Sequence, residues 1–227
     1  ATPVVATVPD HTIPIGTPFQ LTGSATDADP GDVLTYCWEQ NDNSTTSGSN
    51  SIASPAKLTG PNWLSFAPTT SPTRTFPVLN TILSGASITG PLPGGDPGIN
   101  IEALSSVGRN LNFRLTVRDN RPYNGATGAV GQTQFTDMVI TVNAATGPFL
   151  ITSQNTAVSY VSGTTQTVTW SVNGTTGAPV NCTNVKITFS ADGGLTFPTV
   201  LAASTANDGT ESITIPALLT TTGRIKV

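Results

Sequence analysis

Apolar and polar residues alternate along most of the chain, in short runs separated by Gly, Pro, Asn and Asp. In residues 111–118, LNFRLTVR, every second side chain is apolar and the intervening ones are polar or charged. The same alternation recurs at 19–25 and at 134–143. Because successive side chains of a strand point to opposite faces, this period of two predicts half-buried strands and an all-β protein.

Residues 33–40, VLTYCWEQ, carry large side chains on both faces and therefore predict a central strand. Trp38 on this strand, like Trp170 in the later run QTVTWSV, is expected to lie in the core. The segment PVVATV at 3–8 predicts an edge strand, and the acidic turn DADPGD at 27–32 leads into the central one.

Residues 41–106 break this rhythm. They begin with the polar loop NDNSTTSGSNS and later contain GPLPGGDPG, which suits neither a helix nor a central strand. We expect a long excursion off the sheet, packed down by Trp63, Phe66 and Phe76. Loops of this length are uncommon in compact domains and are often functional; the alternative is that the excursion only caps one end of a sandwich.

The small residues of NAATGP at 143–148 indicate a domain boundary, so domains are expected at 1–145 and 148–227. Seven short runs follow the boundary, a spacing typical of an immunoglobulin-like sandwich. They are FLITS, AVSYV, QTVTWSV, NVKITFS, TVLAA, ESITI and RIKV. The second domain has about 80 residues against about 100 in such a sandwich, so its last edge strand is expected to be missing.

The composition narrows the range of partners. Charged residues make up only 10% of the chain, and the net charge is −4 without any basic run, so nucleic-acid binding is not expected. No apolar run approaches the ~18 residues of a membrane span. A surface rich in Thr, Ser and Asn is common on extracellular proteins, and we expect a secreted or cell-surface location.

The chain's two cysteines, Cys37 and Cys182, fall in different predicted domains. A disulfide within one domain is therefore excluded, and both are expected to be buried free thiols. No signal peptide begins at Ala1, so we expect either a mature chain or a piece of a longer one.

The acidic turn is the strongest candidate for a bound ion. Asp27, Asp29 and Asp32 are closely spaced, and Asp119 and Asn120 follow the strand 111–118, whose end belongs at the same pole of a sandwich. Calcium prefers six to eight such oxygens, which makes these residues candidate calcium ligands. The alternative is that Asp-Pro-Gly-Asp is turn chemistry without a metal, with Asp27 bonding local amides as an Asx turn.

A second motif, SADGGLTF at 190–197, resembles the Asp-box of sialidases and other β-rich secreted proteins. Asp192 is expected to accept turn amides, Gly193 and Gly194 to supply positive φ, and Phe197 to pack beneath a tight hairpin. In its usual setting this motif is structural, and we interpret it that way here.

Catalytic groups are scarce. His11 is the single histidine and is expected in an exposed loop, so no HExxH zinc motif is possible, and no G-x-S-x-G elbow is present. We therefore predict no catalytic and no cofactor-binding residues. Trp63 and Tyr123, in loop-like contexts, are the candidates for binding glycans.

Several stretches resemble the region downstream of the catalytic domain in secreted reprolysin-like zinc metallopeptidases of Bacteroidetes-type bacteria. They are TPFQLTGSATDADPGDVLTYCWEQND, SPTRTFP, LNFRLTVRDN, TVTWSVNGTTGAPVNCTNVKITFSADGGLTFPTVLA and TTGRIKV. The resemblance implies two accessory β-sandwiches, with zinc held only in a catalytic domain that would lie N-terminal to Ala1.

The first domain also resembles the cadherin and PKD-like group, in which a D-x-D turn and a later Asp bind calcium at one pole. Asp27 and Asp29 match the D-x-D and Asp119 matches the later Asp. The long 41–106 excursion departs from those compact modules. The fold class expected is therefore two tandem immunoglobulin-like or cadherin-like antiparallel β-sandwiches.

Together these observations predict a non-catalytic accessory region of an extracellular metallopeptidase, acting as a spacer or as a module that binds substrate or a surface. Its expected partners are the catalytic domain of the same polypeptide and an extracellular protein or polysaccharide. The rival hypothesis is a glycan-binding or adhesion module. A third is a self-contained hydrolase with the 41–106 excursion as the rim of its active site.

Overall fold

The computed structural model describes residues 1–44 and 51–227, which form two compact units. The first unit comprises residues 1–13 and 18–142, and the second comprises 14–17 and 143–227. The boundary thus lies slightly before the predicted one, and a short segment from the N-terminal region groups with the second unit. Its hydrogen bonds explain this, because Ile15 N donates to Thr146 O over 3.0 Å and Phe149 N donates to Thr17 Oγ1 over 2.9 Å.

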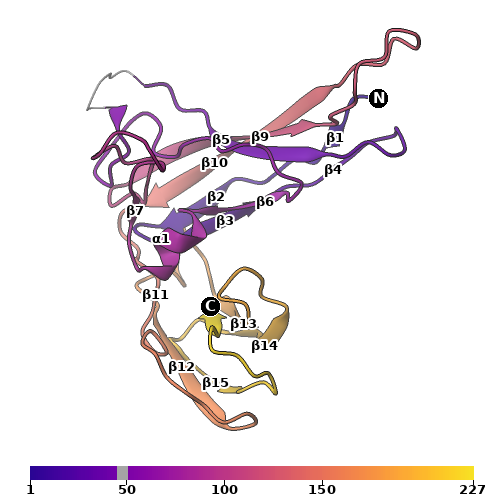
Figure 1. Ribbon diagram of the computed structural model, residues 1–227. Coiled ribbons are helices and arrows are strands. Elements are labelled where there is room, and N and C mark those ends of the chain that lie inside the picture. Colours follow the sequence, from indigo (N-terminus) through magenta and orange to yellow (C-terminus); the bar gives the residue numbers. More distant parts are fainter. Residues whose placement is uncertain (45–50) are drawn as a thin grey trace. The chain divides into compact units, whose positions relative to one another are not determined.

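The first unit is built on a four-stranded sheet with the order β2-β10-β9-β5 (Figure 1). Its strands are β2 (His11–Pro14), β10 (Thr133–Asn143), β9 (Arg109–Arg118) and β5 (Thr35–Gln40). The strands β9 and β10 pair antiparallel along almost their whole length, and β5 pairs antiparallel with the other side of β9. The strand β9 at 109–118 has a neighbour on each side, whereas β5 stands at the edge of this sheet. The expectation of a strand at 33–40 is met from Thr35 onward, but its prediction as a central strand is wrong. Residues of the segment 41–106 cover β5 instead, as in the isolated bridge between Tyr36 and Thr69.

Shorter pairs complete the first unit. The strand β3 (Phe19–Thr22) pairs with β6 (Thr73–Phe76), and β1 (Val4–Val5) pairs with β4 (Ala25–Thr26), both antiparallel. Their buried side chains meet those of the large sheet in one core, whose members include Leu21, Trp38, Phe76, Phe113, Leu115 and Met138. A Cβ on Gly23 would stand 2.1 Å from Leu115 Cδ2, so any side chain at this position would force the buried Leu115 side chain to move.

The segment 41–106 differs from its prediction, and its residues 45–50 lie outside the described part of the chain. It is not entirely off the sheets, because β6 lies within it and brings the fully buried Phe76 into the core, stacked on Phe19 with ring centroids 4.9 Å apart. The rest holds the short helix α1 (Leu79–Leu83) and the paired strands β7 (Ile88–Thr89) and β8 (Glu102–Ala103). Sequence alternation missed β6 because only four residues pair before Pro77 ends the strand.

A buried ion pair connects this segment to the sheet. Arg74 on β6 donates to Glu102 Oε1 over 2.9 Å and to the carbonyl oxygens of Trp38 and Leu64 over 2.7 Å each. The other oxygen of Glu102 accepts from Val78 N and Thr89 Oγ1, both at 2.9 Å. Glu102 is fully buried, and burial lowers the pKa of Arg74.

The second unit consists of two three-stranded sheets, β11-β12-β15 and β14-β13-β16. The first contains β11 (Leu150–Ile151), β12 (Thr165–Ser171) and β15 (Thr210–Thr214). The second contains β14 (Thr199–Ala206), β13 (Asn184–Ser190) and β16 (Arg224–Lys226). Both sheets contribute to one core, formed by Val168, Trp170, Val185, Ile187 and Ile213. The prediction of an all-β protein made of antiparallel β-sandwiches is therefore confirmed.

One predicted strand of this unit is absent. Residues 157–161, AVSYV, have no strand pairing, and their side chains are exposed. Apolar residues without a facing sheet do not form a strand, and this run is held instead by bonds such as Gln154 Nε2 to Tyr160 Oη at 3.3 Å. Both cysteines are free; Cys37 is buried as expected, whereas Cys182 is half-buried. In the described residues no helix has the length and apolar character needed to cross a membrane.

Replacing Glu102 by Gln is expected to destabilise the first unit by about 3 to 5 kcal/mol, because it leaves the buried Arg74 charge without its partner. The free energy of opening of the β9 amides, measured by native-state hydrogen exchange, checks this. Glu39→Gln is the control, since within the described residues the Glu39 carboxylate accepts a single hydroxyl bond, from Thr116, and its effect should stay below about 1 kcal/mol. Equal effects of the two changes would contradict the role given to the pair.

Candidate metal site

The pairing of β5 with β9 brings two distant acidic segments to one end of the first unit. Thr35, the first residue of β5, lies opposite Arg118, the last residue of β9. The acidic turn ends just before β5 and Asp119 follows β9 directly, so antiparallel pairing places them together. Carboxylate oxygens of Asp27, Asp32 and Asp119 lie within 4.8 Å of one another.

Asp119 is the buried centre of this group, with 1% of its surface exposed. Its Oδ1 accepts hydrogen bonds from Gln132 N at 2.8 Å and from Arg121 N at 3.1 Å. Its Oδ2 is buried and has no hydrogen-bond partner among the described residues. A buried carboxylate oxygen without a donor costs free energy, which a bound cation would recover.

Asp27 shows the same division between its two oxygens. Its Oδ1 accepts from Asp29 N at 2.8 Å, which is the Asx turn given above as the alternative to metal binding. Its Oδ2 is buried and, within the described part of the chain, also lacks a partner. Turn chemistry therefore accounts for one oxygen of Asp27 and leaves the other available to a ligand.

The donor set suits a hard divalent cation. Oxygens that each lie 2.3–2.6 Å from one calcium ion can be up to about 5 Å apart, and the separations within the group fall inside that limit. Three carboxylates without His or Cys match calcium or magnesium better than zinc. The carboxylates of Asp27, Asp32 and Asp119 would hold the ion, and water would complete its coordination.

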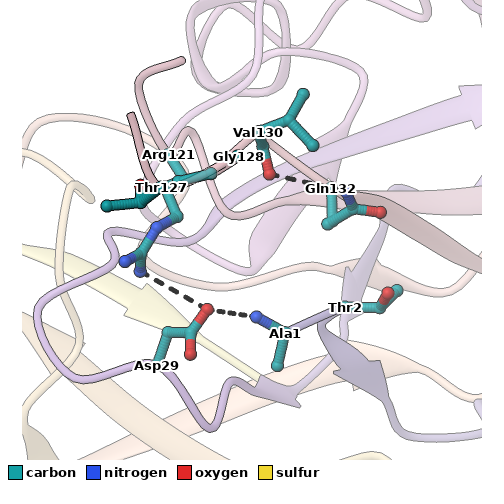
Figure 2. A pocket seen from close by; sticks show the side chains of 9 residues that line it. Ala1, Thr2, Asp29, Arg121, Thr127, Gly128, Val130 and Gln132 are labelled. Atoms are coloured by element: carbon teal, nitrogen blue, oxygen red, sulfur yellow. Dashed lines mark hydrogen bonds and ion pairs between the residues drawn. The ribbon is translucent and has the colours of Figure 1, made fainter. Parts of the chain in front are cut away.

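An arginine that the sequence analysis did not single out also contacts this group. Arg121 Nη1 lies 3.2 Å from each carboxylate oxygen of Asp32 and 3.4 Å from Asp29 Oδ2. The hydrogen bond to Asp32 raises the pKa of Arg121. Figure 2 shows Arg121 and Asp29 facing one another beside a pocket that Ala1 and the loop after β9 also line. The signal in the sequence was the run RDNR, in which an arginine follows Asp119 by two positions.

Two predicted ligands have other roles. Asp29 stands outside the group of three, and its Oδ2 lies 3.4 Å from Arg121 Nη1. Asn120, at a positive φ of 54°, uses its side-chain nitrogen to donate to Val33 O and Thr35 Oγ1 at 2.8 and 2.9 Å. Asn120 therefore ties the loop after β9 to the start of β5. Spacing alone could not distinguish these residues from those that point inward.

The two aromatic candidates also separate. Trp63 is only 4% exposed and packs edge-on against Phe19 and Phe76, at centroid distances of 5.6 and 5.4 Å. The prediction that Trp63 is a surface residue that binds glycans is wrong, because Trp63 packs against Phe19 and Phe76 in the core. Tyr123 is 78% exposed in the loop after β9.

The motif at 190–197 forms the expected hairpin. Asp192 accepts hydrogen bonds from Ser190 Oγ and Thr196 Oγ1, each at 2.6 Å, and from Thr196 N. Gly193 and Gly194 have φ values of 83° and 98°, and Lys226 lies over the ring of Phe197. The hydroxyl of Ser190, followed by the groups of Thr196, holds the pKa of Asp192 well below its usual range. The carboxylate is thereby committed to the turn.

Comparison with known proteins adds little to this geometry. Neither a family model nor a curated protein sequence matches the chain. Among solved structures, the chain is similar to a chimeric titin Z1Z2 functionalized with a KLER exogenous peptide from decorin. The identity is 12%, the TM-score is 0.27, and the match covers 96% of this chain and 85% of that chain. At that TM-score the likeness carries no argument, and the fold assignment depends on the strand pairing described above.

Asp192→Asn is expected to destabilise the second unit at neutral pH and to lose its effect in acid. Because the folded-state pKa is depressed, the carboxylate's contribution is present above its unfolded value, about 3.9, and is lost as the pH falls through the folded one. Melting followed by the methyl NMR signals of Ile187 and Ile213, between pH 2 and 7, measures this. Asp208→Asn, whose carboxylate accepts the Thr210 amide, is the charge-matched control and should have the smaller effect. A difference that stays constant down to pH 2 would contradict the assignment.

Proposed function

We propose that the chain is a non-catalytic pair of β-sandwiches, stabilised by calcium, that serves as an accessory region of an extracellular metallopeptidase. The observation that carries the calcium site is the buried Oδ2 of Asp119, which has no hydrogen-bond partner among residues 1–44 and 51–227 and lies beside the carboxylates of Asp27 and Asp32. A bound ion would tie the turn before β5 to the loop after β9 and so hold one pole of the first unit together. Extracellular modules bind calcium with dissociation constants of about 10⁻⁴–10⁻³ M, which suits a secreted protein.

The metallopeptidase context is supported by the sequence resemblance, above all by YCWEQ and NCTNVKITFSADGGLTFP. Several polar side chains that could act in catalysis are instead engaged in structural contacts, which agrees with a non-catalytic role. Glu102 is held by Arg74, and Asp192 and Ser190 are held within their hairpin. Such a region acts as a spacer, or it engages substrate or a surface on behalf of a neighbouring domain.

A glycan-binding or adhesion module is the second candidate, and the exposure of Tyr123 is the observation that favours it. With Trp63 buried, one of its two predicted aromatic contacts remains. Glycan-array binding that Tyr123→Ala abolishes and Tyr160→Ala preserves would support this alternative, since Tyr160 is a partly exposed tyrosine of the other unit.

Calcium is expected to stabilise the first unit by about 3 to 4 kcal/mol when its concentration is 100 to 1,000 times the dissociation constant. Asp119→Asn should abolish this effect, because the amide oxygen can still accept from Arg121 N and Gln132 N while the anionic ligand is lost. Melting with calcium, with magnesium and with EDTA measures the stabilisation. Asp137→Asn removes a carboxylate that pairs with Arg114 away from the site, and it should leave the calcium effect intact. A wild-type melting temperature that is the same in calcium and EDTA would refute the site.

The accessory role predicts that the chain alone does not cleave casein or gelatin. It also predicts that the parent protein, if shortened by the region 1–227, loses activity several-fold on a large protein substrate and little on a short peptide. Measurement of kcat/KM on both substrates for the full-length and shortened proteins tests this, because a spacer or binding module contributes only where the substrate reaches it. Proteolysis by the isolated chain would overturn the proposal.

A further inference from the structure

Arg121 places a positive charge next to carboxylates that a divalent cation would also bind. Its guanidinium contacts both oxygens of Asp32 at 3.2 Å, and its backbone nitrogen donates to Asp119 Oδ1. One residue thus touches two members of the group Asp27, Asp32 and Asp119. Carboxylates this close repel one another unless positive charge lies nearby, and Arg121 supplies one such charge.

The compensation by Arg121 is incomplete. The guanidinium lies on the Asp32 and Asp29 side, whereas Asp27 Oδ2 and Asp119 Oδ2 receive no hydrogen bond from it or from another described residue. The Asp119 side chain is almost fully buried, so its unpartnered oxygen points to a ligand beyond the arginine. The charge of Arg121 therefore balances the carboxylates on the exposed side of the group, whereas the buried oxygens of Asp27 and Asp119 receive no hydrogen bond from the described residues.

We propose that Arg121 is a built-in competitor of the cation: a divalent ion bound by Asp27, Asp32 and Asp119 displaces the guanidinium from Asp32, and this exchange sets the concentration at which the site fills. The inference depends on the proposed calcium site and concerns its regulation. Both partners use the same Asp32 oxygens, and two positive charges on one carboxylate repel each other.

The arginine has room to leave. Its side chain is 36% exposed, and the following residues 122–128 are exposed as well, so little packing is lost when the guanidinium turns to solvent. The base of the loop stays fixed, because Asp119 N donates to Gln132 O at 3.2 Å and Asp119 Oδ1 accepts the Gln132 amide. The exchange is therefore a movement of one side chain and leaves the loop backbone in place.

Calcium titration of the whole chain by calorimetry tests the competition with wild type, Arg121→Gln and Arg114→Gln. Arg121→Gln is expected to lower the dissociation constant for calcium about tenfold, because the ion no longer displaces a charge. Arg114→Gln is the matched control: it removes an arginine with an equivalent ion pair to Asp137, away from the site, and should change the constant less than twofold. In NMR spectra the wild-type Arg121 side-chain N–H signal, identified by its absence in Arg121→Gln, should move toward that of a free arginine as calcium is added.

The outcomes separate the two proposals. If wild type binds calcium and Arg121→Gln binds it no more tightly, the competition is wrong and the calcium site stands. If only Arg121→Gln binds, the competition is supported and the proposed function fails for the natural chain. If neither protein binds calcium at concentrations up to about 10 mM, both proposals are overturned.

Discussion

The packing of the first unit depends on the buried ion pair between Arg74 and Glu102, because this pair holds the long segment 41–106 against the sheet. Arg74 and Glu102 lie far apart in that segment, and together they satisfy backbone groups of Trp38, Leu64 and Val78. A segment with little regular pairing has many backbone groups to satisfy, and a guanidinium offers five donors in a fixed plane. A buried pair is weak evidence for net stability, since its desolvation is costly. Its effect here is to define where the segment packs, which brings Phe76 and Trp63 into the core.

The candidate metal site depends on the pairing of β5 with β9 in the four-stranded sheet. Pairing of Thr35 with Arg118 fixes the distance between the acidic turn and Asp119, and Asn120 bonds the loop after β9 to the start of β5. A shift of register by one residue would move Asp119 along the strand and turn the apolar face of β9 away from the core. The burial of Leu115 and Val117 therefore maintains the geometry of the carboxylates. Here the packing of the core positions the candidate chemistry.

Alternation predicted the long strands because their burial is periodic, and it predicted that Asp27, Asp32 and Asp119 share a pole because the strands beside them are regular. It failed where tertiary contacts decide. Nothing local distinguishes the buried Trp63 from the exposed Tyr123, since both occur in loop-like sequence and only the aromatic cluster around Phe76 separates them. Asp29 and Asp32 likewise both contact Arg121, yet only Asp32 lies close to Asp27 and Asp119, which spacing does not reveal. The run 157–161 has the composition of a strand and lacks a partner for pairing.

Arg74 and Arg121 bind carboxylates with different consequences, and burial explains the difference. Arg74 is 12% exposed and its partner is fully buried, so separating them would strand two charges away from water, and the pair can only be structural. Arg121 is 36% exposed and Asp32 is 10% exposed, so the guanidinium can exchange its carboxylate for water at little cost. The contact that is weak enough to break adjoins two carboxylate oxygens, one of Asp27 and one of Asp119, that have no hydrogen-bond partner in the described part of the chain. The acidic group beside Arg121 therefore has carboxylate oxygens that a second positive charge could approach, whereas the contact between Arg74 and Glu102 has a structural role.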